Sequence, residues 1–417
     1  MRRGEDIMKI SGKYLIVVVC MCGLSMATVG LLTNVAGLFF SPMADDFGVM
    51  RGSASLTLTI ANICVALGGL ATRKLTKAMP LRVMLLASTA IMAGSTFLMS
   101  IAPNMTLQYV LSATRGLAGG AMGFVLVTYV LNKWFVAQLG LVTSIAMGFS
   151  GLAGAIFTPI IQPVIEGSGW RAGMALIAVL QAALCIPAIL LVPSTDPTDA
   201  GLRPFGLADN KETVSAHHDK SKPVKIDKLV YAGMVCYAVF AAAATAMPQH
   251  FPGYAEEVGL AAATGAGMIS ACMMANTTGK IVMGWMTDRI GALRSIVIYT
   301  ALVVVSIVAL LLLRIPVVFI AGAFLFGLCY GRATVGLTMM CRELFGKRGS
   351  GIVYPVAALG TSISNAIFSA ALGYAYDITG TYTVSLVGLL VLLLGSLALT
   401  FWCYRRAVMG TGQAQEA

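Results

Sequence analysis

Three cationic side chains interrupt long apolar stretches of this sequence: Arg115, Lys280 and Arg332. A charged side chain inside hydrocarbon is costly unless it faces water or an opposite charge. The chain has 17 aspartates and glutamates, and none of them lies well inside an apolar stretch. Because no fixed acid is available as a partner, we expect the three cations to face a mobile anion in a central cavity.

The depth of these cations follows from the rise of a helix. Asp288 marks the end of the apolar stretch that contains Lys280, eight residues earlier, so Lys280 is expected about 12 Å inward. Arg332 lies ten residues before Arg342, which places it about 15 Å inward by the same rise. Arg115 enters from the opposite side and is also expected near mid-depth.

Three further polar side chains are candidates for the same site: Asn276, Tyr330 and Tyr354. Asn276 lies one helical turn before Lys280 and is expected on the same face. The two tyrosines could line a cavity with a polar tip, although packing between helices is the favoured role for each. Arg115 has an alternative role too, because its guanidinium could donate to backbone carbonyls within the bundle.

The segments that carry these residues are apolar enough to cross a bilayer. The chain is 58% hydrophobic and 11% charged, with a mean hydropathy of +0.87. Such long, unbroken runs do not fit the alternating strands of a barrel, so we predict an all-α membrane protein. Twelve spans are expected, at residues 14–40, 53–71, 82–101, 105–131, 139–163, 171–193, 229–249, 261–286, 294–313, 316–340, 350–372 and 382–404.

The charges outside the spans are distributed unevenly between the two sides. Lysines and arginines crowd the N-terminus, the loops after every second span, the central loop and the C-terminal tail. The opposite loops hold only Arg51, Arg171 and Arg314. The positive-inside rule therefore predicts a multi-pass protein of the bacterial cytoplasmic membrane with both termini in the cytoplasm. The net charge of +11 is then a consequence of topology, and no nucleic-acid partner is expected.

A long polar stretch divides the chain into two halves of six spans each. We predict an N-terminal half at residues 1–193, a cytoplasmic linker at 194–228, and a C-terminal half at 229–417 with a short tail. The linker contains His217 and His218, a pair that we interpret as solvated. The cysteines are scattered through apolar segments without metal-ligand spacing. We therefore expect no metal, no cofactor and no enzymatic activity.

One loop carries a recognisable motif. Its members are Gly284, Asp288, Arg289, Gly291 and Arg294. They match the G-x-x-x-D-R-x-G-x-x-R signature of the major facilitator superfamily, and "GGLATRKLTK" in the first half looks like a degraded copy. The chain therefore resembles this superfamily. The resemblance implies two six-helix halves that rock about a central site, with Asp288 docking against a helix of the other half to hold one state closed.

Several short pieces narrow the resemblance. They are "FGVMRGSAS", "NKWF", "GW", "NTTGK" and "YDITGTY", and they are similar to pieces of the bacterial oxalate/formate antiporter and monocarboxylate porter group. That group carries an arginine where Lys280 stands, and a lysine shortly after the tyrosine that matches Tyr354. Here Ala357 and Ala358 leave no cation in that place. We infer that Arg332 supplies the second cation instead.

The expected function is secondary transport of small organic anions, with monocarboxylates favoured. Exchange or facilitated movement is preferred over proton symport, because no membrane carboxylate is available to carry a proton. The lipid bilayer and the anion are the expected partners, and we expect a monomer. The alternatives are an efflux transporter for drug-like molecules and a non-transporting sensor on the same fold.

Overall fold

A computed structural model describes residues 12–136, 138–192, 194–206 and 227–413. Within these ranges the chain is helical, and the only β-type pairing is an isolated bridge between Phe135 and Phe205. A segment in lipid must satisfy its backbone N–H and C=O groups by hydrogen bonds within itself, and a helix does so. The all-α prediction is confirmed.

The first half contains nine of the helical elements. They are α1 (Gly12–Ser25), the π-helical η1 (Met26–Asn34), η2 (Ala36–Phe39), α2 (Phe40–Phe47), α3 (Arg51–Ala78), α4 (Leu81–Ile101), α5 (Met105–Ala121), α6 (Phe124–Trp134) and α7 (Leu139–Leu191). A short 3-10 turn, η3 (Pro197–Ala200), follows in the described part of the linker.

The second half repeats the scheme. It contains α8 (Lys228–Ala243), η4 (Ala244–His250), α9 (Phe251–Glu257), α10 (Ala262–Ile290), α11 (Ala292–Leu312), α12 (Pro316–Gly331), the π-helical η5 (Arg332–Gly336), α13 (Leu337–Thr379) and α14 (Thr383–Gln413). Residues 207–226, which include His217 and His218, lie outside the described residues. The boundaries of the linker therefore stay a prediction.

Ten stretches of the described residues are long and apolar enough to cross a membrane. One of them, 141–191, holds two spans, because the backbone at Gly169 leaves the helical region with a φ of 84°. Glycine is required there, since other residues rarely adopt a positive φ. The helix α10 is not among the ten, because its glycines, threonines and Asn276 lower its hydropathy in addition to its charged residues. Counting both corrections gives the twelve spans expected from the sequence.

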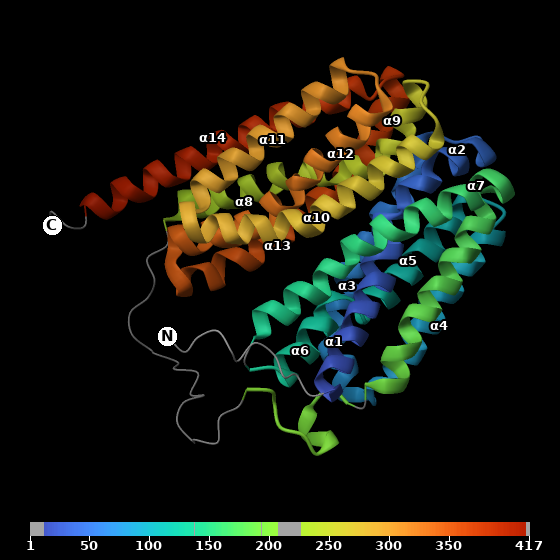
Figure 1. Cartoon of the computed structure of the whole chain (residues 1–417), viewed down its shortest axis with the longest axis horizontal. Helices are drawn as coiled ribbons and strands as arrows, with labels where there is room; N and C mark the ends of the chain where they lie inside the picture. The colour runs from blue at the N-terminus through green and yellow to red at the C-terminus, as the bar shows by residue number, and fades with distance from the viewer. Residues whose placement is uncertain (1–11, 137, 193, 207–226, 414–417) are drawn as a thin grey trace.

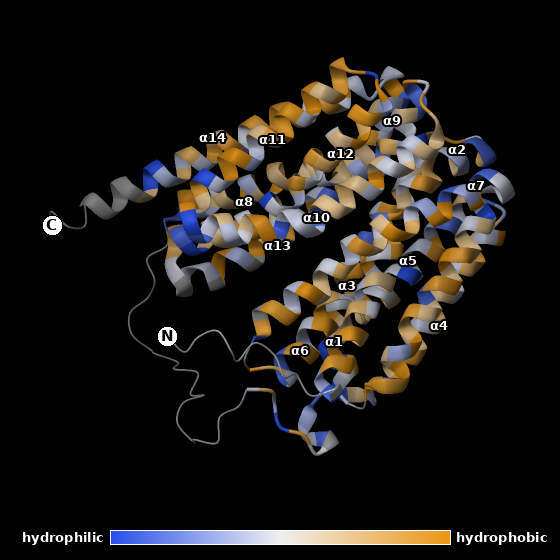
Figure 2. Ribbon diagram, viewed as in Figure 1, coloured by the Kyte–Doolittle hydropathy of each residue, from blue (hydrophilic) through white to orange (hydrophobic). Residues whose placement is uncertain are grey.

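The two halves form two bundles that lie side by side (Figure 1). We call the end where α1 begins and α14 ends the terminal end, and the end that carries α2 and α9 the distal end. Hydrophobic residues cover much of the outer surface of both bundles (Figure 2). Leu70, Val317 and Ile281 are examples, with exposed fractions of 77%, 74% and 67%. In a membrane protein such side chains face lipid. This explains why so many apolar side chains are exposed, since exposing them to water would be unfavourable.

Candidate functional site

Lys280 is held on α10 at a close crossing with α12. The crossing depends on small residues: a Cβ on Gly279 would lie 2.9 Å from the Leu328 side chain, and one on Gly331 would lie 3.1 Å from the Gly279 carbonyl oxygen. The Tyr299 hydroxyl donates to the same Gly279 carbonyl at 2.7 Å. The backbone beside Lys280 is therefore fixed by two neighbouring helices.

The Lys280 ammonium itself is left without a protein partner. The residue is half-buried, and no hydrogen bond, ion pair or ring contact joins it to any other residue that the structure describes. A lysine head group has three N–H donors, so an unpaired one at this depth can bind an anion.

Arg332 is placed differently from the sequence expectation. It is fully buried, and its Nη1 donates to the Ser396 hydroxyl at 2.5 Å while Nη2 donates to the Ala241 carbonyl at 3.3 Å. Its guanidinium also lies 5.9 Å from the ring centre of Tyr237. These partners belong to α8 and α14 of its own half. The guanidinium is therefore engaged within its own half, and no described hydrogen bond or ion pair joins it to Lys280. Its expected role as the second cation of the site stays a prediction.

Arg115 lies inside the first half. Its side chain is 3% exposed and lines a small cavity whose other walls all come from residues 31–177. Lys280 does not line this cavity, and contact between Arg115 and the substrate stays a prediction. Tyr354 is 37% exposed and makes no hydrogen bond, ion pair or ring contact with the residues described, so its role stays a prediction.

Asn276 points toward the boundary between the halves. Its Nδ2 lies 3.8 Å from the Met273 sulfur and 3.5 Å from the Cβ position of Gly151 on α7, and its buried Oδ1 has no partner. The neighbouring Thr277 hydroxyl donates to the Gly148 carbonyl at 3.0 Å. The glycine-rich segment of α7 thus packs against the other half, which is why it tolerates so little side-chain volume.

A chain of polar side chains crosses between the halves near mid-depth. The Thr33 hydroxyl donates to the Asn62 Oδ1 at 3.2 Å, and the Asn62 Nδ2 donates to the Asn365 Oδ1 at 3.4 Å. Asn365 in turn donates to the Thr245 hydroxyl at 2.9 Å, and the Tyr330 hydroxyl donates to the Thr245 carbonyl at 2.9 Å. A cavity of about 130 Å³ adjoins this chain at Thr33. The sequence prediction included Tyr330 but missed the two asparagines, whose amides inside apolar spans were the available signal.

The loop motif is exposed at the terminal end. Gly291 ends α10 with a φ of 83°, and the Ala292 N–H that follows donates to Glu343 Oε1 at 2.7 Å. Arg289 stacks on the Trp285 ring at 4.6 Å. Asp288 is exposed and has no partner among the residues described. The remaining members contribute no described contact either: a Cβ on Gly284 would meet nothing within 4 Å, and Arg294 is exposed.

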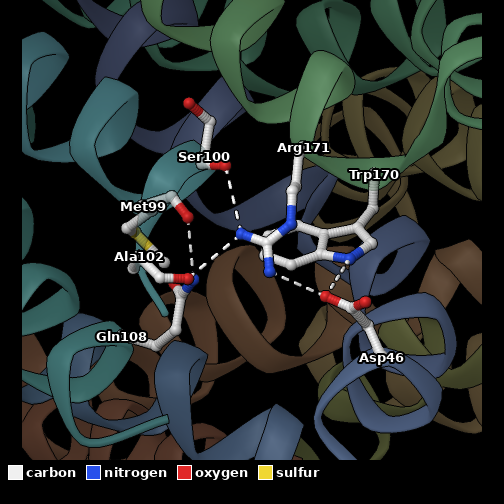
Figure 3. Close-up of polar contacts among 7 residues, drawn as sticks. All are labelled: Asp46, Met99, Ser100, Ala102, Gln108, Trp170 and Arg171. Atoms are coloured by element: carbon white, nitrogen blue, oxygen red, sulfur yellow. Dashed lines mark hydrogen bonds and ion pairs between the residues drawn. The ribbon is translucent and has the colours of Figure 1, made fainter. Parts of the chain in front are cut away.

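At the distal end, a brace of polar contacts ties together three parts of the first half (Figure 3). The Arg171 Nη1 donates to the carbonyls of Ser100 at 3.2 Å and Ala102 at 3.0 Å, while Nη2 donates to Asp46 at 2.8 Å. The Trp170 indole N–H donates to the same Asp46 carboxylate at 3.3 Å. The loop ends of α2, α4 and the second span of α7 are therefore held as one unit.

A second distal cluster joins the two halves. Arg51 Nη2 forms an ion pair with Glu256 at 2.8 Å, and its guanidinium lies 4.6 Å from the ring centre of Tyr376. The Ser41 hydroxyl donates to the same Glu256 oxygen at 2.8 Å. Among the residues described, the hydrogen bonds between the halves lie at this end or near mid-depth. The halves are therefore fastened at the distal side.

Comparisons with known proteins identify the family of this chain. The family model described as "Major Facilitator Superfamily" matches residues 22–368. Monocarboxylate transporter 12-B of Danio rerio is 25% identical over 405 residues, which cover 87% of this chain and 81% of that protein. Monocarboxylate transporter 13 of Rattus norvegicus is 21% identical over 296 residues, which cover 70% of this chain and 65% of that protein. The aligned part is thus less than two thirds of the rat protein.

The fold also matches a solved structure. A bacterial homolog of the human lysosomal transporter Spinster, crystallised in an inward-facing and unoccupied conformation, superimposes with a TM-score of 0.67 at 11% identity. The match covers 96% of this chain and 98% of that one. At this identity the likeness concerns the fold, and it confirms the helical architecture predicted from the sequence.

Proposed function

Because this chain belongs to the Major Facilitator Superfamily, whose model matches residues 22–368, it is a membrane transporter and not an enzyme, and we propose that it moves small organic anions, with monocarboxylates favoured. The observation that carries the proposal is the unpartnered Lys280 ammonium, held near mid-depth at the crossing of α10 and α12. The names of the relatives, monocarboxylate transporters 12-B and 13, support the same class of substrate.

The electrostatics favour an anion over a cation. A carboxylate that reaches Lys280 forms a charge-assisted hydrogen bond in a medium of low dielectric, where such a bond is stronger than in water. A cationic substrate would meet an uncompensated positive charge, since no acid lies close to mid-depth in the spans that the structure describes. The proposed transport mode is exchange or facilitated movement across a bacterial cytoplasmic membrane by a protein that acts as a monomer.

The polar chain between Thr33 and Tyr330 supports the proposed alternation between two states. Its central link, Asn62 to Asn365, is long at 3.4 Å and joins the two halves. Such a bond exchanges readily with water when the halves separate. In the proposed cycle the distal cluster and this link open together, while Asp288 at the terminal end engages the other half.

The test compares binding of carboxylates with binding of their neutral amides. Purified protein is titrated with acetate, propionate and 2-hydroxypropionate, and with the matching amides, while thermal unfolding reports binding. We expect at least one carboxylate to bind and its amide not to bind. Lys280→Met should weaken the carboxylate at least about tenfold, since one charged hydrogen bond is lost.

Two variants control the experiment. Lys280→Arg should keep part of the affinity, because a guanidinium supplies the same charge. Lys74→Met makes the same change at an exposed lysine of α3 that has no described partner, and it should leave affinity unchanged. Folded Lys280→Met protein that binds and transports its carboxylate at wild-type affinity would refute the proposed site.

A further inference from the structure

A pocket in the wall of the first half faces the space between the halves. It has a volume of about 130 Å³ and lies between η1, α3, α5 and α6. Thr33 forms one edge and donates to Asn62, whose amide in turn donates to Asn365 of the second half at 3.4 Å. Ala66, another lining residue, comes one turn after Asn62 on the same face of α3 and is exposed. The mouth of the pocket therefore opens toward the second half.

Lys280 faces the same space from the other side. Thr277, three residues earlier on α10, donates to the Gly148 carbonyl of α7 across the boundary at 3.0 Å. Residues three apart share one face of a helix, so Lys280 follows on the face of α10 that is turned toward the first half. It lies closer to the terminal end than this last contact, where the halves are no longer fastened together.

The pocket and Lys280 lie at similar depth. Asn34 and Met273 meet at Gly154 of α7, where an added Cβ would lie 3.2 Å from the Asn34 Cβ and 2.6 Å from the Met273 Cγ. Val29, which lines the pocket, comes five residues before Asn34. Lys280 comes seven residues after Met273. Both displacements run toward the terminal end, because the chain enters there with α1 and returns there with α10. A molecule between the halves can therefore contact both.

The walls of the pocket favour an apolar group over water or a charged group. None of the described residues that line it is charged, and its larger apolar side chains are those of Val29, Val65, Phe124 and Val125. The Thr28 hydroxyl already donates to the Leu24 carbonyl, and the Thr33 hydroxyl donates to Asn62. The C-terminal end of α5 and the N-terminal end of α6 meet here, so their opposite partial charges offset each other. Water gains little at such walls, and an apolar group that displaces it gains affinity.

We propose that this pocket holds the hydrocarbon part of the transported substrate while Lys280 binds its carboxylate, an inference that rests on the proposed function. An apolar cavity of about 150 Å³ holds a benzene ring, so a pocket of this size admits a compact group of roughly four or five carbon atoms. The substrate class is thus a monocarboxylate with a short, branched hydrocarbon chain, such as 3-methylbutanoate.

The test titrates the purified full-length protein with acetate, 3-methylbutanoate and adamantane-1-carboxylate, and thermal unfolding reports binding. The affinity for 3-methylbutanoate should exceed that for acetate at least about tenfold, because its additional carbon atoms are buried in the pocket. Adamantane-1-carboxylate carries a cage that is too large for the pocket and should bind more weakly than 3-methylbutanoate.

Three variants locate the effect. Ala66→Leu fills the mouth of the pocket and should bring the ratio of the 3-methylbutanoate and acetate affinities close to one. Val29→Ala enlarges the pocket and should strengthen adamantane-1-carboxylate relative to 3-methylbutanoate. Ala90→Leu is the matched control, because it adds the same side chain at an exposed position of α4 that does not line the pocket. It should leave the ratio at the wild-type value.

The outcomes separate this inference from the proposed function. Equal affinities for acetate and 3-methylbutanoate, both dependent on Lys280, would overturn the role of the pocket and leave carboxylate transport standing. A wild-type affinity ratio in folded Ala66→Leu protein would overturn it in the same way. If no carboxylate bound at all, both proposals would be wrong.

Discussion

The Asp377 carboxylate caps the first turn of α3 across the boundary between the halves. Its Oδ1 accepts from the Arg51 N–H at 3.0 Å and its Oδ2 accepts from the Gly52 N–H at 2.7 Å. The first N–H groups of a helix have no partner within the helix, and a negative charge is favoured at that end. One side chain of the second half thus completes a helix of the first, and this contact can exist only while the distal end is closed.

Replacing this carboxylate should favour the state that is open at the distal end. Asp377→Asn puts an N–H donor where an acceptor is needed, so one helix N–H loses its partner. We expect a cost of about 1–3 kcal/mol to the closed state, which shifts the ratio of the two states by about fivefold to a hundredfold. The distance between spin labels at Asp45→Cys and Ala262→Cys, two exposed distal positions, should lengthen in part of the population.

Asp46→Asn is the matched control for that experiment. It makes the same chemical change at the same end, but its partners Arg171 and Trp170 belong to its own half. It should lower thermal stability and leave the label distance unchanged. If both variants moved the labels equally, the cap at Asp377 would have no special role in closure.

Close packing at mid-depth yields a second prediction. A Cβ on Gly151 would lie 2.4 Å from the Thr277 Oγ1 and 2.9 Å from the Met273 carbonyl oxygen. Gly151→Ala should therefore force α7 and α10 apart, lower stability by about 1–3 kcal/mol, and slow uptake. Gly94→Ala, on a helix position with nothing within 4 Å, should be neutral or slightly stabilising. The prediction is checked by measuring thermal unfolding and uptake rates of both variants. Equal unfolding midpoints and equal uptake rates in Gly151→Ala and Gly94→Ala would contradict it.

The sequence predicted the spans well because hydropathy and length report directly on burial in lipid. The sequence also predicts a depth for Arg332, since depth needs only the rise of a helix, and this depth stays a prediction. The direction of that side chain was not predictable. Arg332 begins the π-helical η5, where the period differs from 3.6 residues, and its partners Ser396 and Ala241 come from distant parts of the chain. Asn62 and Asn365 were missed for the same reason, because their contact joins two helices of different halves.

The position of Arg332 leads to a third prediction, about stability. Arg332→Met removes charge-assisted bonds to Ser396 and Ala241 and should destabilise the protein by about 1.5–3 kcal/mol. The affinity for carboxylate should stay at the wild-type value, in contrast to Lys280→Met. Thermal unfolding and ligand titration of the same samples separate the two effects. A loss of affinity at unchanged stability would support Arg332 as the second cation of the site.

Orientation in the membrane is the subject of a fourth prediction. Two of the three cations expected outside, Arg51 and Arg171, are neutralised by Glu256 and Asp46, whereas Lys74 and Arg294 at the terminal end are exposed. The positive-inside rule then places the terminal end in the cytoplasm. Fluorescent and phosphatase reporters fused near residue 217 and after residue 417 should both read cytoplasmic. A periplasmic signal at either place would invert the proposed topology.

The fifth prediction concerns the energy source. A proton-coupled carrier needs a side chain that binds and releases a proton within the spans. Glu256 and Asp377 lie at the distal end and Glu343 near the terminal end, so the described spans hold no carboxylate near mid-depth. His250 is the one histidine within the described ranges, and it is 2% exposed. Its Nε2 lies 2.8 Å from the Ser369 carbonyl oxygen and its Nδ1 lies 3.4 Å from the Tyr382 hydroxyl oxygen. These contacts are consistent with a neutral His250 ring that packs between the helices at the closed distal end.

We therefore expect exchange of labelled substrate in liposomes to persist when an uncoupler collapses the proton gradient at constant pH, so that substrate protonation does not change. His250→Gln, which keeps a side-chain donor and acceptor, should show the same persistence. Loss of every transport mode in the wild type under the uncoupler would establish obligatory proton coupling. If His250→Gln alone then restored gradient-independent exchange, His250 would be the proton carrier. With neither change, Lys280 would keep its charge in place while access to it alternates between the two sides. Only the carboxylate would cross, and the substrate gradient alone would drive the cycle.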